Sequence, residues 1–236
     1  LRWSAAVRKR TAGSFGSLAK QFTTEQRERY TTLASLYELG SWPDLCTKRE
    51  LKGNLHMLDL LDSALGSERP RGPSLDVGSL NWWYLPAQMS AVPGPWTGVE
   101  LDAHQRYASF TTRKGHAEWL CDHHQETQYH AGCVSELNGS YGFVCWFLPY
   151  VVPQPLVSAG LPDRFFEPER LLRHVWSLLA PGGRLLIVNQ SARESEIQGE
   201  LFERLGIEGN SLGLTPSVFA GDDDDERHSW VASKPI

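Results

Sequence analysis

The chain has 236 residues, of which 41% are hydrophobic and 22% are charged, so it is large and apolar enough for a packed domain with an appendage. A formal net charge of −5 argues against a general nucleic-acid-binding surface, and no apolar run is long enough to span a membrane. Four cysteines make no disulfide framework at this length, and the basic first ten residues lack the apolar core of a secretory signal. We therefore expect a cytoplasmic protein with free thiols.

The first 70 residues are predicted to form a helical cap. Residues 1–20 are basic and small, which favours an arm, and a helix is predicted to begin at Thr23 or Thr24 and to end at Gly40. A second helix is predicted from Thr47 to Leu65, because leucines recur along one helical face at positions 51, 55, 58, 61 and 65. We expect this cap either to close over a small-molecule substrate or to pair two copies of the chain in a homodimer.

Residues 71–236 show a different pattern, in which short strands alternate with helices. The predicted strands are 74–79, 96–102, 130–137, 141–152, 183–190 and 228–234, and the predicted helices are 104–124, 167–183 and 192–206. The fourth and fifth strands are almost continuous apolar runs, which is typical of strands buried on both faces. The pattern predicts an α/β fold with a doubly wound, mostly parallel sheet.

Three residues at the ends of the first two strands indicate a nucleotide-like ligand. Asp76 and Gly78 close the first strand, and a glycine there lets the backbone turn tightly and approach a ligand. Glu100 closes the second strand, 24 residues after Asp76, where an acid accepts hydrogen bonds from ribose hydroxyls in dinucleotide folds. In sheets of this kind the ligand lies at the carboxyl ends of the strands.

The motifs of this region resemble those of the S-adenosylmethionine-dependent methyltransferases of the Rossmann-like class. "LDVGSLNWW" resembles their first motif, "GVELD" the second, "FVCWFLPYV" the motif of the fourth strand, and "LLAPGGRLLIV" the helix end and fifth strand. The resemblance covers about residues 70–236. It implies a seven-stranded sheet with an antiparallel last strand, S-adenosylmethionine as cofactor, and methyl transfer to a small molecule. The aromatic residues near the strand ends favour an apolar or aromatic acceptor.

The resemblance also implies which residues hold the cofactor and face the acceptor. The expected cofactor-binding residues are Asp76, Gly78, Ser79, Asn81, Glu100, Leu101, Val134 and Trp146. The residues expected to face the acceptor are Tyr150, Asn189, Gln190 and Phe166, with Phe165 beside them. No catalytic base is identified, and a cap or surface role is the favoured interpretation of His104.

Two departures from the family pattern leave another function open. Leu80 and Trp82 stand where the family has its second and third glycines, and the usual acid of the fourth strand is missing near Tyr141. These changes favour a catalytically silent binding or scaffold protein as the alternative, whereas Glu100 opposes it. An NAD(P)-dependent oxidoreductase is a third hypothesis, against which stands the missing G-x-G-x-x-G.

Other groups of chemically active residues have simpler interpretations. The cysteines and histidines at positions 121, 123, 124, 130 and 133 match no standard zinc spacing, so no metal site is predicted. The acidic run at 221–228 lacks the EF-hand spacing and is interpreted as an exposed hairpin loop. The aromatic residues Trp82, Trp83 and Tyr84 either stack on a ligand or pack on the sheet.

Overall fold

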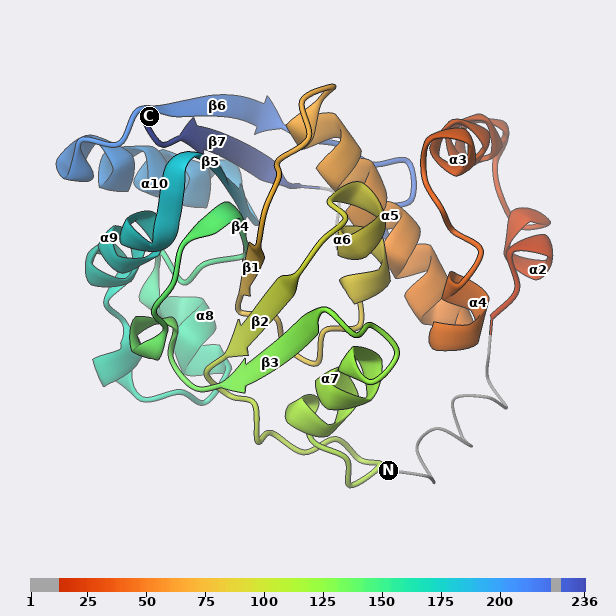
Figure 1. Cartoon of the computed structure of the whole chain (residues 1–236), viewed down its shortest axis with the longest axis horizontal. Helices are drawn as coiled ribbons and strands as arrows, with labels where there is room; N and C mark the ends of the chain where they lie inside the picture. Colours follow the sequence, from red (N-terminus) through yellow and green to blue (C-terminus); the bar gives the residue numbers. More distant parts are fainter. Residues whose placement is uncertain (1–12, 222–225) are drawn as a thin grey trace.

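The protein is built around one mixed β-sheet with helices on both faces (Figure 1). The computed structural model describes residues 13–221 and 226–236. Within these ranges the sheet has seven strands in the order β3-β2-β1-β4-β5-β7-β6. The strands are β1 (Ser74–Val77), β2 (Trp96–Glu100), β3 (Thr127–Ala131), β4 (Tyr141–Phe147), β5 (Leu179–Asn189), β6 (Gly209–Leu214) and β7 (His228–Ser233).

Short and long helices connect these strands. They are α2 (Phe15–Ala19), α3 (Thr24–Leu36), α4 (Trp42–Leu45), α5 (Lys48–Leu65), α6 (Leu85–Ala91), α7 (Arg113–Cys121), α8 (Pro153–Ser158), α9 (Pro168–Leu178) and α10 (Ala192–Leu205). Two single 3-10 turns, η1 (Val134–Glu136) and η2 (Asp163–Phe165), complete the set. Within the described ranges, no helix combines the length and the apolar character needed to cross a membrane.

The direction of the strands confirms the predicted fold class. Strands β3, β2, β1, β4 and β5 run parallel, whereas β7 pairs antiparallel with both β5 and β6. The chain moves outward from β1 to β3 and then returns to place β4 on the other side of β1. This reversal of strand order opens a crevice at the carboxyl ends of β1 and β4, the usual ligand position in such sheets.

Alternate side chains of each strand enter different layers of the core. Trp96, Phe143 and Leu186 belong to the cluster shared with α5 and α6, whereas Val144 and Ile187 belong to the cluster shared with α9 and α10. Figure 1 shows the two helical layers on opposite sides of the sheet. Because both layers bury the strands, β1 and β2 have no exposed residue along their length.

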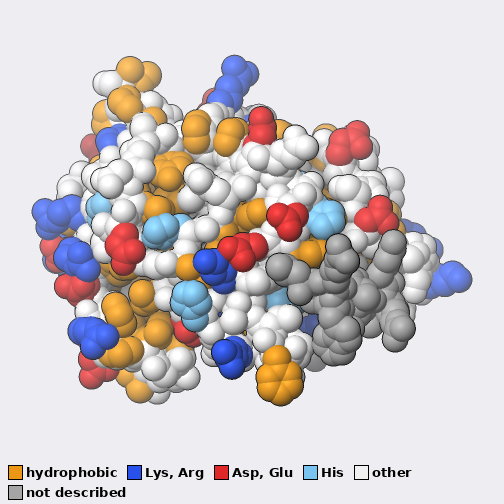
Figure 2. Space-filling view, turned by 60° about the horizontal axis from the view of Figure 1, so that its bottom comes forward, with side chains coloured by type: hydrophobic (Ala, Val, Ile, Leu, Met, Phe, Trp, Pro, Cys, Tyr) orange, Lys and Arg blue, Asp and Glu red, His pale blue; other side chains and the backbone are white. Residues whose placement is uncertain are grey.

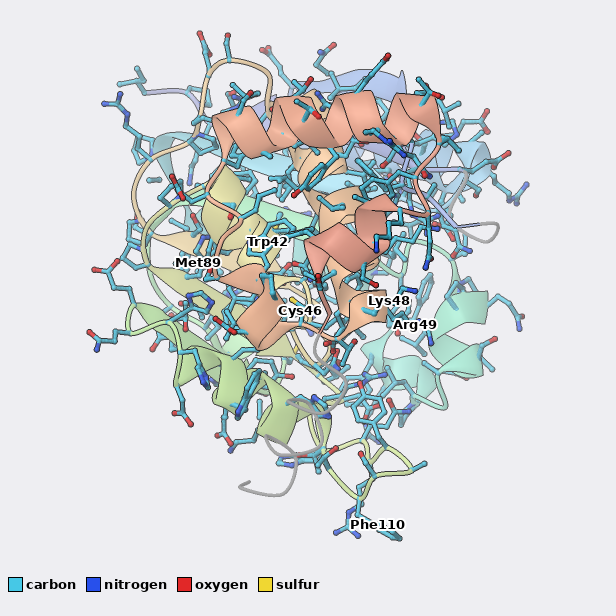
Figure 3. The ribbon with its side chains drawn as sticks, turned by 90° about the vertical axis from the view of Figure 1, so that its right-hand side faces the viewer. Trp42, Cys46, Lys48, Arg49, Met89 and Phe110 are labelled. Carbon is cyan, nitrogen blue, oxygen red and sulfur yellow. The ribbon has the colours of Figure 1, made fainter. Side chains whose placement is uncertain are left out.

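The N-terminal helices pack directly on the sheet layer. Helix α5 begins with a capping box between Thr47 and Glu50, and its buried leucines join one cluster with residues of the sheet. Trp42 and Cys46, viewed in Figure 3, are buried, and the Trp42 indole donates to Ser90 Oγ at 3.2 Å. The core is therefore continuous across residue 70, and the division of the chain there stays a prediction.

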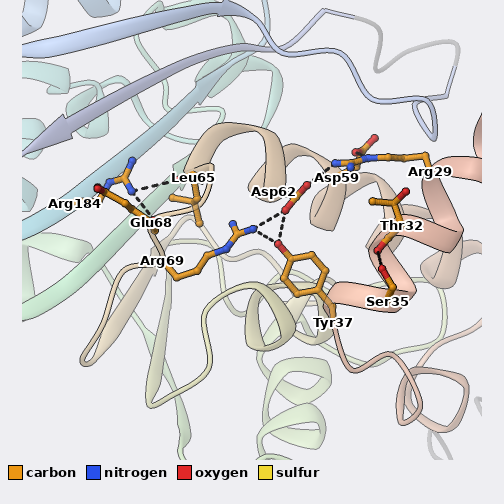
Figure 4. A network of polar contacts seen from close by, with 10 residues as sticks. All are labelled: Arg29, Thr32, Ser35, Tyr37, Asp59, Asp62, Leu65, Glu68, Arg69 and Arg184. Atoms are coloured by element: carbon orange, nitrogen blue, oxygen red, sulfur yellow. Dashed lines mark hydrogen bonds and ion pairs between the residues drawn. The ribbon is translucent and has the colours of Figure 1, made fainter.

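A network of charged side chains links α3 to α5 (Figure 4). Arg29 donates through Nε to Asp59 Oδ1 at 2.6 Å and through Nη2 to Asp62 Oδ2 at 2.7 Å. Asp62 Oδ1 also accepts from the Tyr37 hydroxyl and from Arg69 Nη2, both at 2.5 Å. The network thus fastens α3 to α5 and to the segment that leads into β1.

The predicted helix over 104–124 is wrong in its first half. Only Arg113–Cys121 is helical, because Thr112 caps that helix by accepting from Gly115 N at 3.0 Å. The preceding residues form a loop in which Phe110 has φ +61° and an exposed side chain. Figure 3 shows Phe110 standing away from the body of the protein.

Other boundaries also differ from the sequence expectation, and the strand predicted over 141–152 ends at Phe147. Strand β3 ends at Ala131, so Cys133 and Val134 follow the strand instead of lying within it. Helix α9 ends at Leu178 instead of the predicted residue 183, and Gly182 lies inside β5 with φ +72°. Strand β5 begins at Leu179, which pairs with Tyr141 of β4. The residues from 179 on therefore extend the strand instead of the helix.

Candidate functional site

A cavity of about 400 Å³ lies at the carboxyl ends of the parallel strands. Its walls come from the segments that follow β1, β2, β3, β4 and β5, and from one side of α5. Sites for small molecules and cofactors usually measure about 300–1,000 Å³ and are mostly apolar. The cavity has this size, and Leu, Val, Trp, Phe and Pro side chains make most of its lining.

The loop after β1 keeps a left-handed backbone at three alternate positions. The φ angles are +75° at Gly78, +52° at Leu80 and +55° at Trp82. Leucine and tryptophan rarely adopt this conformation, which costs each of them about 1–3 kcal/mol. The loop therefore has positive φ angles, which favour glycine, although Leu80 and Trp82 stand at two of these positions.

Trp82 is turned away from the cavity and does not fill it. Its side chain is fully buried, and its indole N–H donates to Gln88 Oε1 at 2.8 Å. The ring packs on Gly98 of β2, where a Cβ atom would lie 2.9 Å from it. Trp83 and Tyr84 line the cavity instead, so the three aromatic residues divide between the two expected roles.

Glu100 closes β2 with its carboxylate already engaged. Its Oε2 accepts from Leu80 N at 2.8 Å, and its Oε1 accepts from Asp102 N at 2.8 Å. Arg113 Nη1 lies 3.2 Å from Oε1 and 3.5 Å from Asp102 Oδ2. A carboxylate offers about four lone-pair positions, so these contacts orient Glu100 and still leave room for one more donor.

Asp76 lies behind the cavity wall and is fully buried. Burial raises the pKa of Asp76 to about 7, against the hydrogen bond from Cys145, which lowers it. The Cys145 thiol donates to Asp76 Oδ1 at 3.3 Å. The repulsion from Glu100 raises the pKa of Asp76 further, so this carboxyl changes its protonation near neutral pH.

The expected site residues divide into two groups. Those that line the cavity are Gly78, Glu100, Leu101, Val134, Trp146, Tyr150 and Gln190. Those outside its described lining are Asp76, Ser79, Asn81, Asn189 and Phe166. Phe165 lines the cavity in place of its neighbour, because the turn η2 ends between them. His104 is also outside the described lining.

One wall of the cavity, which α5 supplies, was not predicted from the sequence. Gly53, His56, Met57 and Leu60 line it and recur at helical spacing i, i+3, i+4 and i+7. These residues lie beside the predicted leucine face of the helix. His56, the one histidine among them, was the feature of the sequence that could have indicated a cavity wall. Arg227, Glu194 and Gln198 from the far end of the chain were likewise missed.

The other groups of chemically active residues stay apart. Among the residues that the structure describes, no three His, Cys, Asp or Glu side chains gather as metal ligands. The acidic residues 222–225 lie outside the described residues. Figure 2 shows the end of the molecule toward which β2 and β3 point, where acidic, basic and histidine side chains are interspersed.

Strand order, the antiparallel β7 and the position of the cavity define the fold of the S-adenosylmethionine-dependent methyltransferases, and comparison with solved structures agrees. The chain is similar to a SAM-dependent methyltransferase from Aquifex aeolicus, with 12% identity and a TM-score of 0.52, over 86% of this chain and 97% of that one. It is also similar to phosphoethanolamine N-methyltransferase 2 from Haemonchus contortus in complex with S-adenosyl-L-methionine. That match has 14% identity and a TM-score of 0.50 and covers 76% of this chain but only 52% of the other.

No protein-family model and no curated protein sequence matches the chain. At these identities the likeness to solved structures establishes the fold alone. The expected fold class is therefore confirmed, and the reaction has to be inferred from the site.

Proposed function

We propose that the protein transfers a methyl group from S-adenosylmethionine to a small apolar or aromatic acceptor. The observation that carries the proposal is the cavity at the reversal of strand order, bordered by a left-handed loop after β1 and by an acid after β2. Backbone that turns at Gly78 and an acid at Glu100 suit the two polar parts of a nucleoside ligand.

The residues of the cavity fit this cofactor. Gly78 and Leu80 would flank its amino-acid end, Glu100 would accept from a ribose hydroxyl, and Leu101 and Val134 would contact the adenine. Trp146, at the end of β4, would face the methyl group. Asp76, Ser79 and Asn81 would act indirectly, by holding the loop, since they are outside the described lining.

The bound cofactor would supply a sulfonium whose methyl group is intrinsically reactive. The protein would then hold the acceptor in line with that methyl group and exclude water, an orientation effect of up to about 7–11 kcal/mol. Tyr150, Gln190 and Phe165 are proposed to contact the acceptor, with Asn189 and Phe166 supporting them from behind. The aromatic and aliphatic lining of α5 and of the segment after β4 supports an apolar acceptor.

Thermal unfolding in the presence of candidate ligands tests the proposal. S-adenosylmethionine and S-adenosylhomocysteine should raise the melting temperature, since a ligand at 100 times its Kd adds about 2.7 kcal/mol of stability. Stabilisation by NAD alone would support an oxidoreductase. The absence of any shift would support the silent scaffold, which the substitution of Leu80 and Trp82 for glycines favours.

A matched pair of variants ties binding to the site. Glu100→Gln should abolish stabilisation by S-adenosylhomocysteine, because the amide loses one acceptor and the pairing with Arg113. Glu118→Gln is the control, since Glu118 is an exposed acid on α7 that contacts Lys114. Equal ligand responses in both variants would reject Glu100 as the ribose acid.

Three further assignments stay proposals. We infer a homodimer through the N-terminal helices, supported by Leu36 of α3, which is 61% exposed. Leu36→Glu should then halve the mass measured by light scattering.

The four free cysteines support a reducing, cytoplasmic location. The net charge of −5 and the interspersed charges on the face shown in Figure 2 support a small-molecule substrate over general nucleic-acid binding.

A further inference from the structure

Three polar side chains line the cavity from the segment that follows β5. They are Gln190, Glu194 and Gln198, each four residues after the last, so Glu194 and Gln198 lie on one face of α10. Gln190 is exposed, Glu194 is partly buried, and Gln198 is only 1% exposed. Gln198 is therefore the member of this wall that is shielded most completely from solvent.

The side-chain amide of Gln198 is buried with its nitrogen unbonded. Among the residues that the structure describes, Gln198 Nε2 has no hydrogen-bond partner. The other two residues of the wall bond each other, since the backbone N of Gln190 donates to Glu194 Oε2 at 3.0 Å. Nearly all buried polar groups in proteins have a partner, so a donor left open beside a cavity indicates a partner that enters the cavity.

Gln88 is a buried glutamine of the same chain with a structural role. It is fully buried, its Oε1 accepts from the Trp82 indole at 2.8 Å, and its Nε2 donates to Cys145 Sγ at 3.2 Å. Both ends of that amide are bonded inside the core. Gln198 is buried to almost the same degree but keeps an open donor, as expected of a side chain that meets a ligand.

The surroundings of Gln198 are apolar. Leu201, less than one turn later on α10, and Leu171 and Leu172 of α9 also line the cavity. A hydrogen bond is stronger in such surroundings than in water, and an amide N–H₂ group is a donor only. The partner that suits Gln198 is therefore an acceptor oxygen on a ligand whose remaining surface is mostly apolar.

The charges of the cavity lining favour a neutral oxygen. The charged side chains in the described lining are Glu100, Glu194 and Arg227, two acids and one base. This balance offers no net attraction for an anionic group. Burying a charge is also far more costly than burying a neutral carbonyl that is hydrogen-bonded.

We propose that Gln198 is a specificity-determining residue that donates a hydrogen bond to a neutral carbonyl oxygen of the methyl acceptor. This inference rests on the proposed methyl transfer and deepens it by naming the acceptor class: a mainly apolar molecule that carries a ketone, ester or amide group. The apolar part packs on the leucines and aromatic residues of the cavity, and the carbonyl oxygen reaches Gln198.

Acetophenone and ethylbenzene are a matched pair of probes, because they differ only in a carbonyl group in place of a methylene group. Their dissociation constants are measured by NMR titration in the presence of S-adenosylhomocysteine. Gln198→Leu should weaken the binding of acetophenone about 10-fold and should not weaken that of ethylbenzene. Gln154→Leu, which changes an exposed glutamine of α8, is the control and should leave both constants unchanged.

Thermal unfolding of the free protein distinguishes a binding role from a structural one. Gln198→Leu should raise the melting temperature by about 2–4 °C, because leucine removes a buried donor that has no partner. Gln88→Leu should lower it, since Trp82 and Cys145 would lose their bonds to this amide. Gln198→Met, which keeps an unbranched side chain, repeats both measurements if Gln198→Leu does not fold.

Three results would overturn the assignment: no binding of acetophenone to the wild type, an equal change in the affinity of both probes, or a lower melting temperature for both substitutions of Gln198. Stabilisation by S-adenosylhomocysteine is measured on the same proteins, and Gln198→Leu should retain it. Its absence from the wild type would refute the proposed methyl transfer, whereas its presence together with any of the three results would refute the carbonyl assignment alone.

Discussion

Asp62, which is half-buried, and Asp76, which is fully buried, lie in two regions that affect a carboxylate in opposite ways. Burial alone would raise the pKa of Asp62, but hydrogen bonds from Tyr37, Arg29 and Arg69 outweigh it, and the pKa is lowered. Asp76 is buried more completely, receives only neutral donors, and its pKa is raised to about 7. One carboxylate is stabilised in its charged form, and the other is not.

The region around Asp62 holds helices together, whereas the region around Asp76 borders the candidate site. Around Asp62, two arginines and a phenol fasten α3, α5 and the approach to β1 (Figure 4). Around Asp76, a strained loop, an uncompensated acid and a cavity meet. Local strain and perturbed acids concentrate at functional sites, where stability is lower than it would otherwise be.

The largest effect is expected from Trp82→Ala, which removes the anchor of the strained loop. Trp82 is fully buried and donates to Gln88, which in turn donates to Cys145. The cavity left by the indole should lower the free energy of unfolding by about 3–5 kcal/mol. Urea denaturation monitored by circular dichroism measures this. A loss below about 1 kcal/mol would mean that the loop is not held by its tryptophan.

Asp76→Asn should stabilise the protein, unlike most substitutions of buried polar residues. The folded-state pKa is raised, so the wild type loses stability as pH rises from about 4 to about 7, and the full cost is present above pH 7. At pH 8 the variant should gain about 2–4 kcal/mol. Urea denaturation at pH 5 and pH 8 checks this, and a gain that does not grow with pH contradicts it.

Asp62→Asn should have the opposite sign and a smaller size. The lowered folded-state pKa gives stability that is present above the unfolded value near 4 and is lost as pH falls through the folded value. The arginines are partly solvent-screened, so we expect a loss of about 1–2 kcal/mol at pH 7. Unfolding curves from pH 3 to 7 should show a flatter acid limb in the variant. An unchanged limb would show that the network adds nothing.

Leu80→Gly should give the smallest change, a gain of up to about 1 kcal/mol. Glycine relieves the left-handed backbone at φ +52°, and part of this gain is offset by the greater entropy of the unfolded chain. Leu148→Gly is a parallel test of the same backbone strain, since Leu148 also lines the cavity and has φ +53°. Destabilisation of both variants would indicate that the loops are not strained.

Most strands of the sheet could be predicted from the sequence, because the central ones are almost continuous apolar runs. The apolar runs of β4 and β5 and the antiparallel β7 were expected and are present. The segment 104–112 was expected to be helical, and the local composition gave no warning that Thr112 would cap a later start. In the site, the placement of Gly78 and Glu100 at the cavity was foreseen, but the wall from α5 was not.

The order of residues by itself determined most of the strands and the longer helices, because burial on two faces or one face leaves a periodic trace in hydrophobicity. It did not predict β6, whose residues are mostly exposed, or the short helix α6. It also determined that an acid follows β2 and that a glycine follows β1. Only the tertiary structure decided that Trp82 turns inward, that Arg113 engages Glu100, and that Cys145 donates to Asp76. These relations join residues distant in the chain or on opposite sides of a turn, and no periodicity records them.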